Sequence, residues 1–177
     1  MKRSKREHFI VDGYNVVNSW PELIALRDNL GYARDQLVHT LAEYGAYEDY
    51  EITIVFDALF TESERSYEKI NERLQIIYTE EGETADSCIE KLAYDLVRQD
   101  KDVHVVTSDG AEQSLILGAG AYRMPSPDLR KAVQKTKQMI REKYTAEHVL
   151  PLRRSELGNR IDTETAAKLD KIRKNNQ

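Results

Sequence analysis

The chain has 177 residues, of which 40% are hydrophobic, so it is long enough for one ordinary α/β core and too short for two independent cores. Its one cysteine, Cys88, excludes an intramolecular disulfide framework and a cysteine-rich zinc site. The basic residues 1–7 run into an apolar stretch, 9–11, that is too short for a signal peptide or a membrane span. We therefore expect a cytoplasmic protein with no membrane partner.

The net charge of −5 is unevenly distributed along the chain. Residues 1–122 carry 12 Lys and Arg against 24 Asp and Glu, whereas residues 123–177 carry 14 against 7. An acidic body repels polyanions unless cations are bound to it, and a basic C-terminal third attracts them. Solvated helix faces at both ends explain the same distribution without any ligand, and this interpretation remains open.

Apolar, largely β-branched runs predict five strands, and segments with helical periodicity lie between them. The predicted strands are 8–12, 50–57, 74–78, 103–107 and 121–124, and the predicted helices are 33–47, 84–98, 112–117 and 128–148. Near-continuous apolar runs are typical of parallel strands that are covered on both faces. The pattern predicts a three-layer α/β/α sandwich with a mainly parallel central sheet of about 4–5 strands.

The domain organisation follows from the change in composition after the long last helix. We expect one α/β domain over residues 1–150 and a basic, partly helical C-terminal extension over residues 151–177.

Three aspartates fall where an open parallel sheet binds its ligands, at the carboxyl ends of the strands. Asp12 ends the first strand, Asp86 lies in the first turn of a helix, and Asp109 follows the strand 103–107. Carboxylates that crowd together repel one another unless they hold protons or a cation, and Mg²⁺ takes carboxylates, waters and substrate phosphates as ligands. Such an ion activates water and polarises a phosphate, so the pattern predicts a phosphodiesterase.

Each acidic residue also has a purely structural interpretation. Asp12 and Asp109 each precede a glycine, as in ordinary turns, and Asp86 suits the positive end of a helix dipole. Asn15 follows Asp12 by three residues, close enough to orient a water or a carboxylate. Asp57 ends another predicted strand, either as an acid that supports the metal ligands or as the first residue of a loop.

Four short motifs, taken in their order and spacing, carry a resemblance to a known family. They are IVDGYNVV at 10–17, VFDA at 55–58, ETAD at 83–86 and VTSD at 106–109. Together they resemble the YacP-type branch of the NYN domains, which belong to the PIN-like nucleases. The resemblance spans about residues 9–129.

The resemblance implies a metal-dependent endoribonuclease of the bacterial cytoplasm, with Mg²⁺ or Mn²⁺ as cofactor. The best-described members associate with the ribosome and cut mRNA in the decoding site, so the implied partners are mRNA and the ribosome. By motif matching, Asp12, Asn15, Asp86 and Asp109 are the implied catalytic residues, and the three aspartates are the implied metal ligands. Gln113 stands where related nucleases have another acid, which leaves cleavage with one metal open.

Side chains for RNA contact are predicted from charge and aromaticity, and they are Tyr14, Arg123, Arg130, Lys131 and Lys135. A different class of function also fits the sequence, namely an RNA- or ribosome-binding module without nuclease activity. A haloacid dehalogenase-type phosphatase is disfavoured because Tyr14 stands where that chemistry needs a second aspartate. No GxGxxG or P-loop pattern follows a predicted strand, so no nucleotide cofactor is expected.

Overall fold

The computed structural model describes residues 6–58, 65–108 and 118–148. The chain divides into two compact units, residues 1–138 and residues 139–177, and the described part of the second unit is the end of one helix. In chain order the elements are β1 (Glu7–Asp12), α1 (Gly13–Val17), α2 (Pro21–Ile24), α3 (Leu30–Glu48), β2 (Glu51–Phe56), β3 (Ser66–Lys69), β4 (Leu74–Tyr78), α4 (Ala85–Arg98), β5 (Asp102–Val106), β6 (Tyr122–Met124) and α6 (Ser126–His148).

The strands in the described residues form one sheet of six in the order β3-β4-β2-β1-β5-β6. Every neighbouring pair from β4 to β6 is parallel, and β3 alone runs antiparallel to its neighbour β4. The predicted mainly parallel sheet is therefore confirmed, although the expected number of about 4–5 strands was too low because β3 was not foreseen. The strand order reverses at β1, which lies between β2 and β5.

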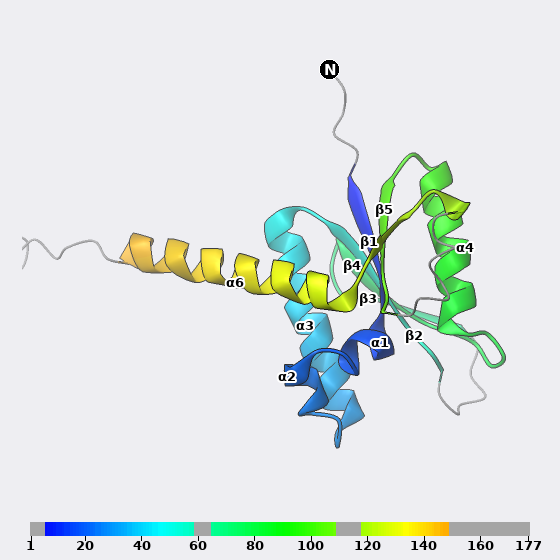
Figure 1. Ribbon diagram of the computed structural model, residues 1–177, viewed down its shortest axis with the longest axis horizontal. Coiled ribbons are helices and arrows are strands. Elements are labelled where there is room, and N and C mark those ends of the chain that lie inside the picture. Colours follow the sequence, from blue (N-terminus) through cyan, green and yellow to red (C-terminus); the bar gives the residue numbers. More distant parts are fainter. Residues whose placement is uncertain (1–5, 59–64, 109–117, 149–177) are drawn as a thin grey trace, which may run out of the picture. The chain divides into compact units, whose positions relative to one another are not determined.

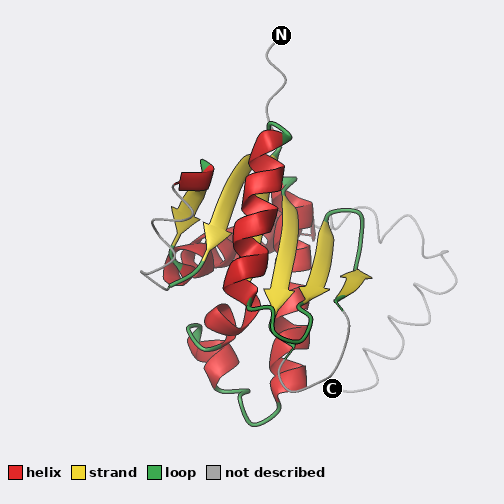
Figure 2. Ribbon diagram, turned by 90° about the vertical axis from the view of Figure 1, so that its right-hand side faces the viewer, coloured by secondary structure: helices red, strands yellow, loops and turns green. Residues whose placement is uncertain are grey.

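Helices cover both faces of the sheet, which confirms the three-layer arrangement (Figures 1 and 2). Side chains alternate along β1, so that Phe9 and Val11 enter the core beneath α1, α2, α3 and the start of α6, whereas Ile10 enters the core beneath α4. Cys88 is buried in the second core, as expected for a packed thiol. Burial on both faces explains why β1 reads as a continuous apolar run.

The helix ends have local causes in the sequence. The Asn29 side chain accepts a hydrogen bond from the Tyr32 N–H at the start of α3, and Asp49 ends that helix in the left-handed conformation with a φ of 64°. Thr84 caps α4 by accepting a hydrogen bond from the Ser87 N–H. These caps determine where α3 begins and ends and where α4 begins.

The short helices α1 and α2 and the strand β3 were absent from the sequence prediction. Strand β3 is exposed along its whole length, so no apolar pattern marks it. The predicted helix 112–117 and the predicted extension 151–177 lie outside the described residues. Within the part of the chain that is described, no helix has the length and apolar character needed to span a membrane.

Candidate active site

The carboxyl ends of the parallel strands meet at one edge of the sheet, and the candidate residues gather along it. Asp12 is the last residue of β1, Asp57 follows β2, and Thr107 and Ser108 follow β5. Because β1 pairs with β2 on one side and with β5 on the other, the reversal of strand order lies between β1 and β5. Ligands of open α/β sheets bind at this point.

Asn15 joins the end of β1 to the end of β5. The Asn15 N–H donates to Asp12 Oδ1 at 3.1 Å, which makes Asp12 the N-cap of α1. The Asn15 Oδ1 in turn accepts a hydrogen bond from the Ser108 N–H at 3.0 Å. Two of the predicted catalytic residues, Asp12 and Asn15, are thus brought together. Asn15 also holds the backbone of Ser108, the residue immediately before Asp109, which is another predicted catalytic residue. Asp109 itself lies outside the described residues.

Gly13 lets this turn pack directly against the sheet. A Cβ atom at Gly13 would lie 2.2 Å from Cε1 of Phe56, so no other residue fits without movement of the ring. The Tyr14 ring packs edge-on against the same ring, with centroids 5.0 Å apart. The Asp12-Gly13 pair is therefore more than a common turn signal, because the glycine determines how closely the Asp12 backbone approaches β2.

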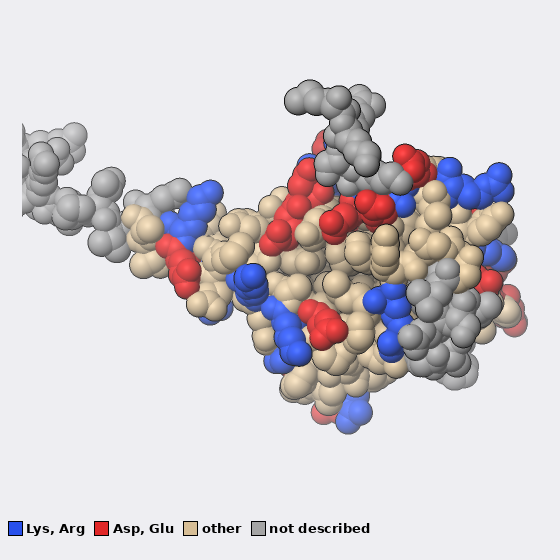
Figure 3. Space-filling model, turned by 45° about the horizontal axis from the view of Figure 1, so that its top comes forward, with Lys and Arg blue, Asp and Glu red and all other residues tan. Residues whose placement is uncertain are grey.

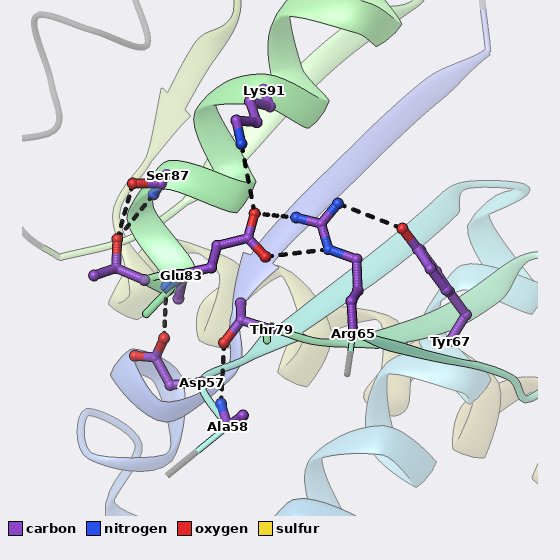
Figure 4. A network of polar contacts seen from close by, with 10 residues as sticks. Asp57, Ala58, Arg65, Tyr67, Thr79, Glu83, Ser87 and Lys91 are labelled. Atoms are coloured by element: carbon purple, nitrogen blue, oxygen red, sulfur yellow. Dashed lines mark hydrogen bonds and ion pairs between the residues drawn. The ribbon is translucent and has the colours of Figure 1, made fainter. Parts of the chain in front are cut away.

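Asp57 fixes the start of α4, which carries Asp86. Its Oδ1 accepts a hydrogen bond from the Ala85 N–H at 2.6 Å, and Figure 4 shows this carboxylate directed at the helix terminus. Asp86 is the next residue and is exposed in the first helical turn. The sequence left two interpretations of Asp57 open, and the structure gives it a definite contact beside a predicted metal ligand.

Glu83, which precedes α4, is committed to ion pairs. It forms a bidentate pair with Arg65 and a further contact with Lys91, whose Nζ lies 3.8 Å from Oε1 of Glu83 (Figure 4). The Glu83 side chain is only 8% exposed, and its hydrogen bonds raise the pKa of Arg65 above the ordinary arginine range. Glu83 therefore stabilises the segment that leads into α4, and its carboxylate oxygens are in contact with cationic side chains.

Comparison with known proteins identifies the family. The family model described as "YacP-like NYN domain" matches residues 9–174. The chain belongs to the YacP-like NYN domain family. It is 39% identical over 132 residues to a Bacillus subtilis protein described as "Uncharacterized protein YacP", which covers 74% of this chain and 77% of that protein.

Solved structures give the same result. A crystal structure of a mutant of Rae1 (YacP) from Bacillus subtilis matches this NYN protein with a TM-score of 0.70 and 36% identity, covering 84% of this chain and 88% of that one. A second crystal structure of Rae1 (YacP) matches with a TM-score of 0.67 and 35% identity over 94% of each chain. The family and the fold predicted from the sequence are confirmed. NYN domains are generally nucleases, and this membership supports an RNase-type function.

NYN and PIN-like nucleases generally use divalent metal ions, and the donors at the carboxyl edge have suitable chemistry. Asp12 and Asp86 offer carboxylate oxygens, which Mg²⁺ and Mn²⁺ prefer, and Mg²⁺ is typically held by one or two carboxylates with waters and a substrate phosphate. Among the described residues no three His, Cys, Asp or Glu side chains are grouped to hold a metal ion. The third predicted ligand, Asp109, falls outside that search.

The side chains predicted for RNA contact differ in their surroundings. Arg130 forms an ion pair with Glu22, with 2.9 Å between Nε and Oε2, so it joins α6 to α2. Arg123 is half-buried, and its Nε finds no hydrogen-bond acceptor within the described part of the chain. Lys131 and Lys135 are exposed on α6. Acidic side chains gather over the upper part of the body in Figure 3, with basic groups around them. The RNA-contact roles stay predictions.

Proposed function

We propose that this NYN protein is a metal-dependent endoribonuclease that hydrolyses mRNA phosphodiester bonds in association with the translating ribosome. The observation that carries the proposal is the hydrogen-bonded path at the carboxyl edge of the sheet. In that path Asn15 joins Asp12 to the Ser108 backbone, one residue before Asp109. A site of this kind at the reversal of strand order, in a family of nucleases, supports phosphodiester cleavage.

In the proposed site Asp12, Asp86 and Asp109 hold Mg²⁺ or Mn²⁺. When bound, the ion supplies Lewis acidity, which polarises the scissile phosphate and lowers the pKa of a water ligand. Asn15 keeps its Oδ1 on the Ser108 N–H, which leaves its Nδ2 hydrogens to orient an acceptor such as Asp12 or a substrate oxygen. Asp57 sets the position of Asp86 through the Ala85 N–H.

Because the surroundings of the site are acidic, RNA binding depends on the cation. The first 122 residues carry 24 acidic against 12 basic side chains, so the body repels an RNA strand by itself. Cations at the carboxyl edge reverse that repulsion locally, and the basic C-terminal third, with 14 basic against 7 acidic residues, adds attraction. With its charge divided in this way, the protein binds mRNA more readily when the ribosome presents the strand.

A bacterial translation extract programmed with a reporter mRNA tests this function. We compare the wild-type protein with Asp12→Asn and Asp86→Asn, with and without a block of translation initiation, and map new 5′ ends. Glu90→Gln, at an exposed position one turn after Asp86 on α4, is the matched control.

We expect new 5′ ends with the wild type and the control only, and their loss under the block. Cleavage by both aspartate variants would contradict the catalytic assignment. Cleavage that persists under the block would contradict the dependence on translation. Ribosome binding without any cleavage would favour the alternative of a binding module.

A further inference from the structure

Arg34, in the second turn of α3, is held in an unusual way for a basic residue of this protein. Its guanidinium carbon lies 6.0 Å from the ring centroid of Phe56 and 6.0 Å from that of Tyr78. The two rings stack on each other, with centroids 5.9 Å apart and planes inclined by 22°. The guanidinium thus rests on a paired aromatic support.

This aromatic support belongs to the carboxyl edge of the sheet. Phe56 and Tyr78 are the last residues of β2 and β4, and they are register partners in the parallel pair. Phe56 also contacts the Gly13 backbone, next to Asp12. Because Arg34 lies beside the last residues of β2 and β4, it stands at the candidate active-site edge. It belongs to α3, which covers one face of the sheet together with α1 and α2 (Figure 1).

No carboxylate neutralises Arg34 within the described residues. Three of the other half-buried arginines have acidic partners there: Arg65 pairs with Glu83, Arg73 with Asp49, and Arg130 with Glu22. Arg34 is half-buried, and its guanidinium contacts the two rings. A positive charge without a counter-ion at this position favours an anion from outside the protein.

Stacking on aromatic rings prepares a guanidinium for such an anion. The ring faces attract the cation electrostatically. A guanidinium carries its N–H donors in one plane, in a geometry that matches two oxygens of a phosphate. Contact with the two rings restricts the positions open to the guanidinium before an anion binds.

We propose that Arg34 is a phosphate-binding residue that holds the RNA strand beside the scissile bond, on the α3 side of the active site. The inference rests on the proposed function, because it takes RNA as the ligand. It assigns the contact to the backbone, so the contribution of Arg34 is independent of base identity. The support from Phe56 and Tyr78 distinguishes this contact from the exposed lysines of α6.

Equilibrium binding of short fluorescein-labelled RNAs tests the inference separately from cleavage. The full chain carries Asp86→Asn in every sample, so that the probes, oligouridylate and oligoadenylate, stay intact during titration with Mg²⁺ present. Arg34→Gln and Arg34→Lys are compared with this parent at several KCl concentrations. Arg98→Gln is the matched control, because Arg98 lies 5.5 Å over the Tyr94 ring at the other end of α4.

We expect Arg34→Gln to bind both probes about ten-fold more weakly, which is the loss of one charge-assisted contact. The slope of log K against log salt should fall in magnitude by about 0.7, the value for one phosphate contact to a single strand. Arg34→Lys should keep the slope and lose affinity, since it keeps the charge and loses the fork. Arg98→Gln should match the parent.

Equal binding and equal slopes for Arg34→Gln and the parent would overturn the inference, as would binding by none of the proteins. An equal loss in Arg34→Gln and Arg98→Gln would also overturn it. If Arg34→Gln also has a lower urea midpoint than the parent, lost stability is a second explanation for its weaker binding. Arg34→Lys separates the two explanations, because a salt-dependence slope equal to that of the parent is specific to a phosphate contact. Arg34-dependent binding by a protein whose wild type cleaves no RNA would refute the nuclease function and leave this site standing.

Discussion

Phe56 and Asp57 are neighbours in sequence with different tasks at the carboxyl edge. The Phe56 ring packs against the Gly13 backbone and supports Arg34, while the Asp57 carboxylate accepts the Ala85 N–H. The sequence predicted that Asp12 and Asp57 end strands, because apolar runs mark strands well. It did not predict that Asp57 accepts from the Ala85 N–H, since that partner lies 28 residues along the chain and its position depends on how α4 packs.

Replacing Gly13 by alanine tests the close contact with Phe56. The new methyl group would lie 2.2 Å from a ring carbon, so the ring or the turn must move. We expect a loss of about 1–3 kcal/mol in the free energy of unfolding, measured by urea denaturation. Gly118→Ala, where no atom of the described residues lies within 4 Å of the new Cβ, is the control and should be near neutral. Equal midpoints for the two variants would contradict the contact.

Asp57 separates a positioning role from metal binding when two variants are compared. Asp57→Asn keeps an oxygen that accepts the Ala85 N–H, whereas Asp57→Ala removes it. We expect Asp57→Ala to lose about 1 kcal/mol in unfolding free energy, as when a helix cap is deleted, and to cleave RNA more slowly. Asp57→Asn should retain most of both properties. A loss of Mg²⁺-dependent cleavage that is equal in the two variants would instead identify the carboxylate as a metal ligand.

At the scale of elements, periodicity predicted the long segments and missed the short or exposed ones. Strand β4 has the predicted limits of Leu74–Tyr78, and α4 begins one residue after the predicted start. Helices α1 and α2 have only 5 and 4 residues, too few for a helical period to appear. Among the described strands the exposed β3 pairs only with β4, and an edge strand of this kind has no buried face to mark it.

The junction between α2 and α6 depends on Trp20, whose Nε1 donates to the Ser126 carbonyl at 3.0 Å. Trp20→Phe removes the donor and leaves a buried carbonyl without its partner. We expect a loss of about 1–3 kcal/mol in unfolding free energy by urea denaturation, with the sheet retained. Tyr47→Phe, at a position 41% exposed, is the control for an aromatic replacement and should be near neutral. A Trp20→Phe protein as stable as the wild type would show that the bond contributes little.

At the scale of the whole sheet, the amino ends of the strands carry a different polar group from the carboxyl ends. His8 is buried there, with Nδ1 at 3.1 Å from Oε2 of Glu51 and Nε2 at 2.9 Å from Oγ1 of Thr53. Burial lowers the pKa of His8, against an opposing effect of its hydrogen bond to the Glu51 carboxylate. Burial acts to raise the pKa of Glu51, but the hydrogen bond and charge of Lys101, together with those of His8, outweigh this, and the pKa falls below its usual value.

These shifts predict how stability depends on pH. Unfolded His8 takes up a proton near pH 6.5, whereas folded His8 does so only at lower pH. Unfolding therefore becomes easier as the pH falls below about 6.5, because the unfolded state binds more protons. The contribution of Glu51 is present above its unfolded pKa of 4.5 and is lost only as the pH falls through its lower folded value. The histidine effect thus begins at a higher pH than the glutamate effect.

Urea denaturation between about pH 7.5 and pH 5 measures the histidine contribution. The His8→Gln protein should lose less stability than the wild type over this range, since it lacks the group that resists protonation in the folded state. His39→Gln, at an exposed position of α3, should follow the wild type. Parallel curves for His8→Gln and the wild type would contradict the shift assigned to His8.

The most direct test of the central claim is the chemistry of the RNA ends that the protein produces. Ribosome-bound mRNA is incubated with the wild type, Asp12→Asn, Asp86→Asn and Glu90→Gln, each with Mg²⁺ or with a chelator followed by Mg²⁺ or Mn²⁺. Hydrolysis by a metal-activated water predicts 5′-phosphate and 3′-hydroxyl ends from the wild type and Glu90→Gln, restored on adding metal back and absent from both aspartate variants. Cleavage that survives chelation, or cyclic phosphate ends, would contradict a metal-dependent hydrolase built on Asp12 and Asp86.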